Sequence, residues 1–196
     1  MHIGIFLDRD GTVNEETDFL TSPDELRLID GSADAIRLAN DLGLKVFIIT
    51  NQSAVARGLL TEDRLAEIHS HLIALLKSNH AHIDAIYYCP HHPEFGEPPY
   101  RTDCVCRKPN TGMLMQAARE FDIDLKRSFV IGDRIIDIQT GNNIGAPSIL
   151  VLTGYGKEEA KHLHENSVRI DHVAENLYGA IQYIKHVIHQ EQPSSP

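Results

Sequence analysis

Two carboxylates stand two residues apart in the segment Asp8-Arg9-Asp10-Gly11-Thr12, directly after the apolar run 3–7. Side chains two apart in an extended segment face the same way, so the two acids would repel each other. A hard dication such as Mg²⁺ relieves that repulsion, and such a pair can hold the metal while one carboxylate attacks phosphorus. The other can protonate the leaving oxygen and then activate water. The alternative is a surface turn, because Asp and Gly are common turn residues.

Three further groups of polar residues could support this chemistry. Thr50-Asn51-Gln52-Ser53 follows the apolar run 45–49, and its hydroxyl and backbone N–H groups are suited to hold phosphate oxygens. A helix cap is the alternative interpretation of that segment. Lys108 could neutralise the charge on a transferring phosphoryl group. In Gly132-Asp133-Arg134, after the run 128–131, Asp133 is placed to complete the ligand set of the metal.

The cysteines and nearby histidines form two tight pairs at metal-ligand spacing, Cys89-Pro90-His91-His92 and Cys104-Val105-Cys106. Three thiolates and one imidazole make a closed tetrahedral zinc set of the structural type, whereas the alternative is a chance cluster of free thiols. Zinc at Cys106 would also aim the adjacent Arg107 and Lys108 at the active site. We interpret the histidines that lack such partners, His69, His71, His80 and His82, as solvated positions on or after a helix.

These residues need a scaffold, and short apolar runs that alternate with helical patterns predict a doubly wound α/β fold around a parallel sheet. The predicted strands are 3–7, 45–49, 83–88, 128–131 and 148–152. The predicted helices are 32–42, 61–78, 111–121, 134–143 and 173–187, with Thr61 as a cap of the second. Ligands of such sheets gather beyond the carboxyl ends of the strands, so the polar residues after the strands should form one site.

The length of 196 residues predicts a single domain over 1–189, with an irregular insertion at 89–110 and a disordered polar tail at 190–196. A net charge of -10 without a basic run argues against nucleic acid or an anionic membrane as a partner. No apolar run approaches the roughly 18 residues of a membrane span, and the amino terminus lacks a signal-peptide pattern. We therefore expect a cytoplasmic protein, and a monomer.

In their order along the chain, these groups resemble the signatures of the haloacid-dehalogenase superfamily of phosphohydrolases over nearly the whole length. Those signatures are Asp-x-Asp-Gly-Thr, a strand-terminal Thr or Ser, a Lys, and Gly-Asp followed by an acidic residue. The resemblance implies a three-layer fold with Asp8 as nucleophile and Asp10 as general acid and base. It implies Thr50 and Lys108 as stabilisers of the phosphoryl group. It implies that Mg²⁺ is held by the Asp8 carboxylate, the Asp10 backbone carbonyl and Asp133. Asp137 is expected to support this site rather than to ligate the metal directly.

Only 13–30 and 89–110 remain to cover the site, so we expect no large cap. The zinc loop, with Cys106-Arg107-Lys108-Pro109, resembles one branch of the superfamily. That branch removes the 7-phosphate from D-glycero-D-manno-heptose 1,7-bisphosphate, and histidinol-phosphate phosphatases are its relatives.

This resemblance favours His91 over His92 as the fourth zinc ligand and implies a sugar bisphosphate as the substrate, its second phosphate contacted by Arg107. The implied substrate-binding residues are Glu16, Thr17, Asp18, Phe19, Asn51, Gln52, Ser53, Arg57, Arg107 and Arg134. The alternatives are histidinol phosphate or another small monoester as the substrate, or a non-catalytic zinc-braced binding protein on an inherited fold.

Overall fold

The computed structural model describes residues 1–165 and 168–191. Its elements are β1 (Gly4–Leu7), η1 (Pro23–Glu25), α1 (Ser32–Asp41), β2 (Lys45–Asn51), α2 (Glu62–Ser78), β3 (Ala85–Cys89), α3 (Gly112–Phe121), η2 (Leu125–Arg127), β4 (Phe129–Gly132), α4 (Ile135–Asn142), β5 (Ser148–Val151), α5 (Gly156–Glu159), η3 (Ala160–Glu165), β6 (His172–Ala174) and α6 (Leu177–Glu191). Within these ranges no helix combines the length and the apolar character that a membrane span requires.

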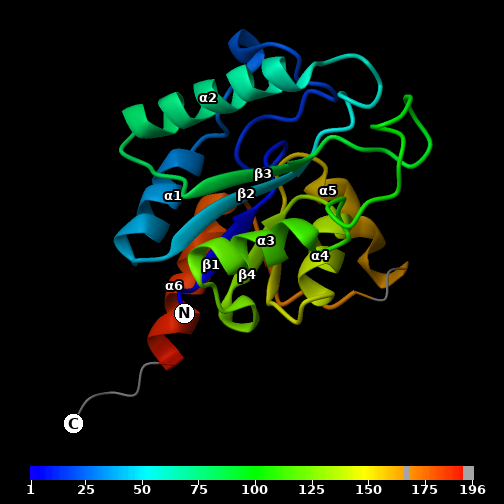
Figure 1. Ribbon diagram of the computed structural model, residues 1–196. Coiled ribbons are helices and arrows are strands. Elements are labelled where there is room, and N and C mark those ends of the chain that lie inside the picture. The colour runs from blue at the N-terminus through cyan, green and yellow to red at the C-terminus, as the bar shows by residue number, and fades with distance from the viewer. Residues whose placement is uncertain (166–167, 192–196) are drawn as a thin grey trace.

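The strands form one parallel sheet in the order β3-β2-β1-β4-β5-β6 (Figure 1). β1 lies between β2 and β4, with Ile5 opposite Val46 on one side and Phe129 on the other. The chain winds outward from β1 to β3, then crosses back to β4 and winds the other way. The winding therefore reverses between β1 and β4, the place where open sheets of this type bind their ligands.

Alternate residues of β1 enter two different cores. Ile5 and Leu7 are fully buried with apolar residues of α1, α2 and α6, whereas Phe6 is buried on the other face with Phe47 and residues of α3. Figure 1 shows α3 and α4 together on one side of the sheet, opposite α1 and α6. This arrangement confirms the predicted three-layer doubly wound fold, and the described residues contain no large cap.

The last predicted helix, 173–187, was wrong at its start, because residues 172–174 form the edge strand β6 and α6 begins at Leu177. A strand of three residues is too short to show a period of two, and its apolar residues merged with the helical pattern behind it. Asn176 marks the true start, since its Oδ1 accepts from the backbone N of Gly179 at 3.0 Å. The short α5 and η3 were not predicted.

Two boundary predictions have different outcomes. Thr61 caps α2 as expected, because its Oγ1 accepts from the backbone N of Arg64 at 3.2 Å. The predicted tail 190–196 begins inside α6, which extends to Glu191, and its remaining residues lie outside the described part of the chain. The single-domain boundary at residue 189 stays a prediction.

Candidate active site

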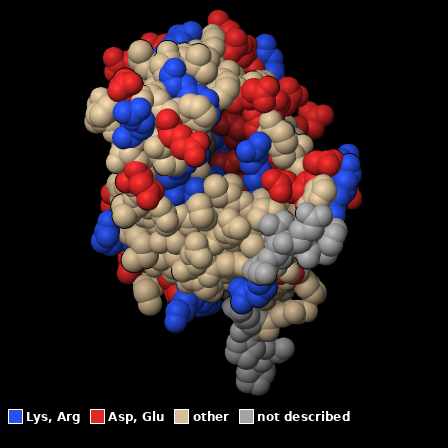
Figure 2. Space-filling view, turned by 90° about the vertical axis from the view of Figure 1, so that its right-hand side faces the viewer, with Lys and Arg blue, Asp and Glu red and all other residues tan. Residues whose placement is uncertain are grey.

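The segments that follow β1, β2, β3 and β4 meet at one edge of the sheet and surround a cavity of about 350 Å³. Figure 2 looks at this side of the molecule and shows a hollow in which acidic and basic side chains lie close together. The cavity is lined by Asp8, Arg9, Asp10, Glu16, Asp18, Phe19, Leu20, Thr50, Asn51, Gln52, Ser53, Ala54, Arg57, His92, Arg107, Lys108, Arg134, Ile136, Asp137 and Tyr155. Of the predicted site residues outside the zinc set, Thr17 instead lines a neighbouring cavity, and Asp133 is fully buried.

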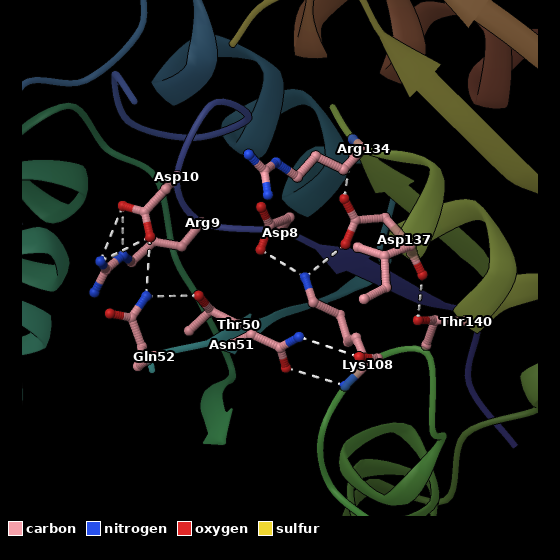
Figure 3. A network of polar contacts seen from close by, with 11 residues as sticks. Asp8, Arg9, Asp10, Thr50, Asn51, Gln52, Lys108, Arg134, Asp137 and Thr140 are labelled. Carbon is pink, nitrogen blue, oxygen red and sulfur yellow. Dashed lines mark hydrogen bonds and ion pairs between the residues drawn. The ribbon is translucent and has the colours of Figure 1, made fainter. Parts of the chain in front are cut away.

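Lys108 joins two carboxylates on the floor of the cavity (Figure 3). Its Nζ donates to Asp8 Oδ1 and to Asp137 Oδ1, both at 2.6 Å. Burial opposes the charge on Lys108, but Asp137 and Asp8 outweigh burial and raise its pKa above the ordinary value. Burial raises the pKa of Asp8 to about 7, against the opposing effect of Lys108 and with the repulsion of Asp137 and Asp10. Without a further cation, the Asp8 carboxylate is therefore held in an environment that disfavours its charge.

Asp133 supplies an oxygen without a partner next to this pair. Its Oδ2 accepts from the backbone N of Tyr155 at 2.8 Å, whereas its Oδ1 is buried and has no hydrogen-bond partner. Burial, followed by the charges of Asp8 and Asp137, raises the pKa of Asp133 to about 8. A buried, unpaired carboxylate oxygen beside a second acid fits a hard divalent cation such as Mg²⁺.

Each of Asp8, Asp133 and Asp137 offers an oxygen within 4.8 Å of the others. Asp137 differs from the other two because donors already engage both of its oxygens. Its Oδ1 accepts from Lys108, and its Oδ2 accepts from the backbone N of Arg134 at 3.2 Å. This difference favours Asp8 and Asp133 as metal ligands and a supporting position for Asp137.

Asp10 is held by side chains from two segments, the one after β1 and the one at the end of β2. Arg9 donates to both of its oxygens at 2.8–3.0 Å and Gln52 Nε2 donates at 2.9 Å (Figure 3). Asn14 Nδ2 also donates at 2.9 Å. Burial alone would raise the pKa of Asp10, but the Arg9 charge and these hydrogen bonds lower it below its ordinary value. The carboxylate is thus fixed in position and in its charged form.

Arg9 is itself enclosed, with only 1% of its surface exposed. Its Nη1 lies 3.2 Å from Nε2 of His69 on α2. The interpretation of His69 as a solvated helix position was therefore wrong. Burial and the Arg9 charge lower the pKa of His69 to about 3, so the ring is neutral and can accept from the guanidinium. The sequence pattern could not show this contact because Arg9 and His69 are 60 residues apart.

The segment 50–52 contacts both Asp10 and Lys108 and does not cap a helix. Gln52 Nε2 donates to Asp10 Oδ2 at 2.9 Å and to Thr50 Oγ1 at 2.8 Å. Asn51 pairs with the backbone of Lys108, donating to its carbonyl at 3.2 Å and accepting from its N–H at 3.0 Å. The end of β2 therefore positions both the Asp10 carboxylate and the Lys108 backbone.

The predicted zinc residues lie together at the base of the 89–110 insertion. The sulfurs of Cys89, Cys104 and Cys106 are 3.0–3.3 Å apart, and His91 Nδ1 lies 3.7 Å from the Cys89 sulfur and 3.5 Å from that of Cys106. His92 is engaged elsewhere, since its Nδ1 accepts from the backbone N of Glu94 and of Phe95. A soft donor set of three sulfurs and one imidazole nitrogen fits zinc.

Three arginines surround the opening of the cavity. The Arg57 guanidinium lies 3.6 Å from the ring centroid of Phe95, and Arg107 Nη1 donates to the carbonyl of His91 at 3.1 Å. Arg134 lies 3.9 Å from the ring centroid of Tyr155. Tyr155, like Arg9, was not among the predicted site residues. Its position after the predicted strand 148–152 could have identified Tyr155, because polar residues after the predicted strands were expected to form the site and Thr50 and Asp133 were found in that way.

Comparisons with known proteins agree with this fold. A family model described as HAD-hydrolase-like matches residues 105–180. The D-glycero-D-manno-heptose-1,7-bisphosphate 7-phosphatase of Chlorobaculum tepidum is 37% identical over 183 residues, which cover 90% of this chain and 91% of that protein. The D-glycero-beta-D-manno-heptose-1,7-bisphosphate 7-phosphatase of Escherichia coli is 39% identical over 152 residues, 76% of this chain and 79% of that protein.

The solved structures include the same kind of enzyme. D,D-heptose 1,7-bisphosphate phosphatase from B. bronchiseptica, complexed with magnesium and phosphate, superposes with a TM-score of 0.83 at 34% identity. The match covers 98% of this chain and all of that one. The chain therefore belongs to the haloacid-dehalogenase superfamily, among its phosphoric monoester hydrolases. The relatives named above act on a heptose bisphosphate.

Proposed function

We propose that this protein is a Mg²⁺-dependent phosphohydrolase that removes the 7-phosphate from D-glycero-D-manno-heptose 1,7-bisphosphate through an aspartyl-phosphate on Asp8. The observation that carries the proposal is the Asp8 carboxylate, which Lys108 orients beside the unpartnered oxygen of Asp133 at the floor of an arginine-rimmed cavity. The sequence relatives support the choice of sugar, because they carry that activity in their names.

In the first step, an oxygen of Asp8 attacks phosphorus, and the bond from phosphorus to the sugar oxygen breaks. Asp10 takes up a proton when the phosphate ester binds, donates it to that leaving oxygen, and returns to the charged form that its contacts favour. In the second step, Asp10 takes a proton from water, and the water oxygen attacks phosphorus and releases Asp8 and inorganic phosphate. Thr50 Oγ1 and Lys108 Nζ stabilise the phosphoryl oxygens during both steps.

Mg²⁺ would be held by the Asp8 carboxylate, the Asp10 backbone carbonyl and Asp133. When bound, it supplies charge neutralisation to the phosphoryl oxygens and to the crowded acids. The unpartnered Asp133 Oδ1 and the raised pKa values of Asp8 and Asp133 support this assignment, since both carboxylates lack a sufficient cation of their own.

A bisphosphate suits this cavity, because three arginines line it and add positive charge to that of Lys108. We propose that Arg107 binds the second phosphate, because its guanidinium is oriented by the His91 carbonyl. Arg57 and Arg134 complete the positive rim. Two groups of lining residues face the sugar in this proposal. They are Glu16, Asp18 and Phe19 after β1, and Asn51, Gln52 and Ser53 at the end of β2. Thr17 lines the adjoining cavity, and its part in substrate binding is to connect Glu16 and Asp18 in the chain.

Zinc, in this proposal, is bound by Cys89, His91, Cys104 and Cys106 and has a structural role. A closed set of four protein ligands leaves no position for a reacting water. The support is geometric, because the same short segment that carries Cys106 continues directly into Arg107 and Lys108. A cytoplasmic, monomeric enzyme without nucleic acid or membrane partners is part of the same proposal.

The test measures phosphate release from heptose 1,7-bisphosphate with and without Mg²⁺, for the wild-type protein and for Asp8→Asn. We expect turnover that requires Mg²⁺, a phosphorylated wild-type intermediate trapped by acid quench and detected by mass spectrometry, and neither signal in the variant. Unchanged turnover by Asp8→Asn would refute the mechanism. A higher kcat/KM for histidinol phosphate than for the heptose bisphosphate would refute the choice of substrate while leaving the chemistry in place.

A further inference from the structure

Tyr155 contacts three separate parts of the site. Its backbone N donates to Asp133 Oδ2 at 2.8 Å, its ring lies under the Arg134 guanidinium at 3.9 Å, and its hydroxyl donates to Asp18 Oδ1 at 3.0 Å. Asp133 belongs to the proposed metal site, Arg134 to the positive rim, and Asp18 to the 13–30 segment over the cavity. One residue therefore contacts the floor of the site through its backbone and the rim through its side chain.

The backbone around Tyr155 is built for this close approach. Gly154 has a φ of +52°, and a Cβ at that position would lie 2.1 Å from Asp133 Oδ2. A Cβ on Gly156 would lie 1.8 Å from the carbonyl oxygen of Val151. Glycine on both sides thus lets the turn after β5 press against Asp133, and this placement directs the Tyr155 ring over Arg134.

Arg134 needs such a support because its own side chain is exposed. An exposed arginine samples many rotamers, and holding it in one costs conformational entropy. A cation on an aromatic ring within about 6 Å of the centroid is attracted to it, and the planar guanidinium can stack while its N–H edge still binds phosphate. The Tyr155 ring therefore prepares Arg134 for an anion that arrives in the cavity.

Tyr155 also forms the wall between two cavities. It lines the site itself and the neighbouring cavity, which it shares with Glu16, Thr17 and Asp18. Its hydroxyl donates to the side chain of Asp18, whose backbone φ of +57° is uncommon for a residue other than glycine. Loss of the side chain would remove the ring from Arg134 and the hydroxyl from Asp18 together.

We infer that Tyr155 is a positioning residue for recognition of the second phosphate, acting through Arg134 and through the 16–19 segment that its hydroxyl holds. This inference rests on the proposed function, because it requires a substrate with a phosphate far from Asp8. It assigns to the turn after β5 a role in substrate selectivity that is separate from the reacting groups.

The experiment compares Tyr155→Leu and Tyr155→Phe on two substrates, heptose 1,7-bisphosphate and p-nitrophenyl phosphate, which has no second phosphate. We expect Tyr155→Leu to raise KM for the bisphosphate about tenfold with kcat within about twofold. The kcat/KM for p-nitrophenyl phosphate should stay within about twofold. Tyr155→Phe keeps the ring, so its KM should rise by no more than about threefold.

Arg134→Met provides the coupling test. Because Tyr155 acts through Arg134, adding Tyr155→Leu to Arg134→Met should raise KM for the bisphosphate by less than about threefold, not by a further tenfold. Tyr178→Leu, at an exposed tyrosine on α6, is the matched control and should leave both substrates unaffected.

Equal losses on both substrates, or full additivity with Arg134→Met, would overturn the inference while leaving the proposed function intact. A wild-type protein without preference for the bisphosphate over histidinol phosphate or p-nitrophenyl phosphate would overturn both.

Discussion

Lys108 Nζ lies 2.6 Å from Asp137 Oδ1 and 2.6 Å from Asp8 Oδ1, so one ammonium group is shared by two carboxylates from distant segments of the chain. The Lys108 and Asp137 side chains are 3% and 1% exposed. In such a setting the loss of one partner is costly, because the remaining charges cannot be solvated by water. The same contacts also aim the ammonium at the place where Asp8 meets phosphorus.

Replacement of Lys108 should therefore destabilise the protein as well as inactivate it. We expect Lys108→Met to lower the free energy of unfolding by about 3–5 kcal/mol in Mg²⁺-free buffer, because two buried acids lose their counter-charge. Urea denaturation measures this change. Adding Asp137→Asn to Lys108→Met should recover part of the loss, since one of the unpaired charges is removed. Lys161→Met, at an exposed ion pair, should cause no measurable change; a similar loss there would contradict the explanation.

The guanidinium of Arg9 should matter for the chemical step more than for substrate binding. Arg9 donates to both oxygens of Asp10, and a lysine cannot reproduce this two-pronged geometry. We expect Arg9→Lys to lower kcat on the heptose bisphosphate by about tenfold or more, with KM within about threefold. Steady-state kinetics checks this, and circular dichroism controls for folding. An unaltered kcat would show that Asn14 and Gln52 suffice to hold Asp10.

His69 should make the stability of the protein depend on pH. Its pKa is about 3 in the folded protein against an ordinary value of 6.5, so below pH 6.5 the unfolded chain binds more protons than the native one. The contribution of neutral His69 is therefore present at neutral pH and is lost as the pH falls below 6.5. The size of the loss is about 1.4 kcal/mol for each pH unit until the folded pKa is reached.

Urea denaturation at pH 7.5, 6.5 and 5.5 tests this dependence with His69→Gln. The difference in unfolding free energy between wild type and variant should shrink toward acid, because the glutamine does not titrate. Ile73→Gln, at an exposed position of the same helix, replaces no titrating group and should show a constant difference. A pH-independent difference for His69→Gln would mean that folding does not shift the pKa of the ring.

The thiol cluster should control the placement of Arg107 and Lys108. We expect Cys104→Ser to lose bound zinc, measured by elemental analysis of the purified protein, and to raise KM for the bisphosphate by about tenfold. Val105→Ser is the matched control, since this residue lies between two predicted ligands and is 78% exposed. It should keep both zinc and KM. Full activity of a zinc-free Cys104→Ser protein would argue against a structural role for zinc.

Some features of this protein follow from local sequence alone. The apolar runs place Asp8, Thr50 and Asp133 at strand ends, and the carboxyl ends of parallel strands share one edge, so their convergence could be predicted without coordinates. The spacing of the cysteine pairs likewise brings them close through short segments. Each of these inferences starts from a short local pattern, either a polar residue beside an apolar run or two ligands separated by one residue.

Other features were decided by tertiary structure, because they depend on strand order and on the path of the connecting segments. Lys108 meets Asp8 across 100 residues, and His69 meets Arg9 across 60. The strand β6 is stabilised by its pairing with β5 rather than by its own three residues. Tyr155 reaches Arg134 and Asp18 only because glycines let the turn after β5 approach Asp133. Local patterns report the type of each element, whereas contacts between distant segments arise only when those elements pack together.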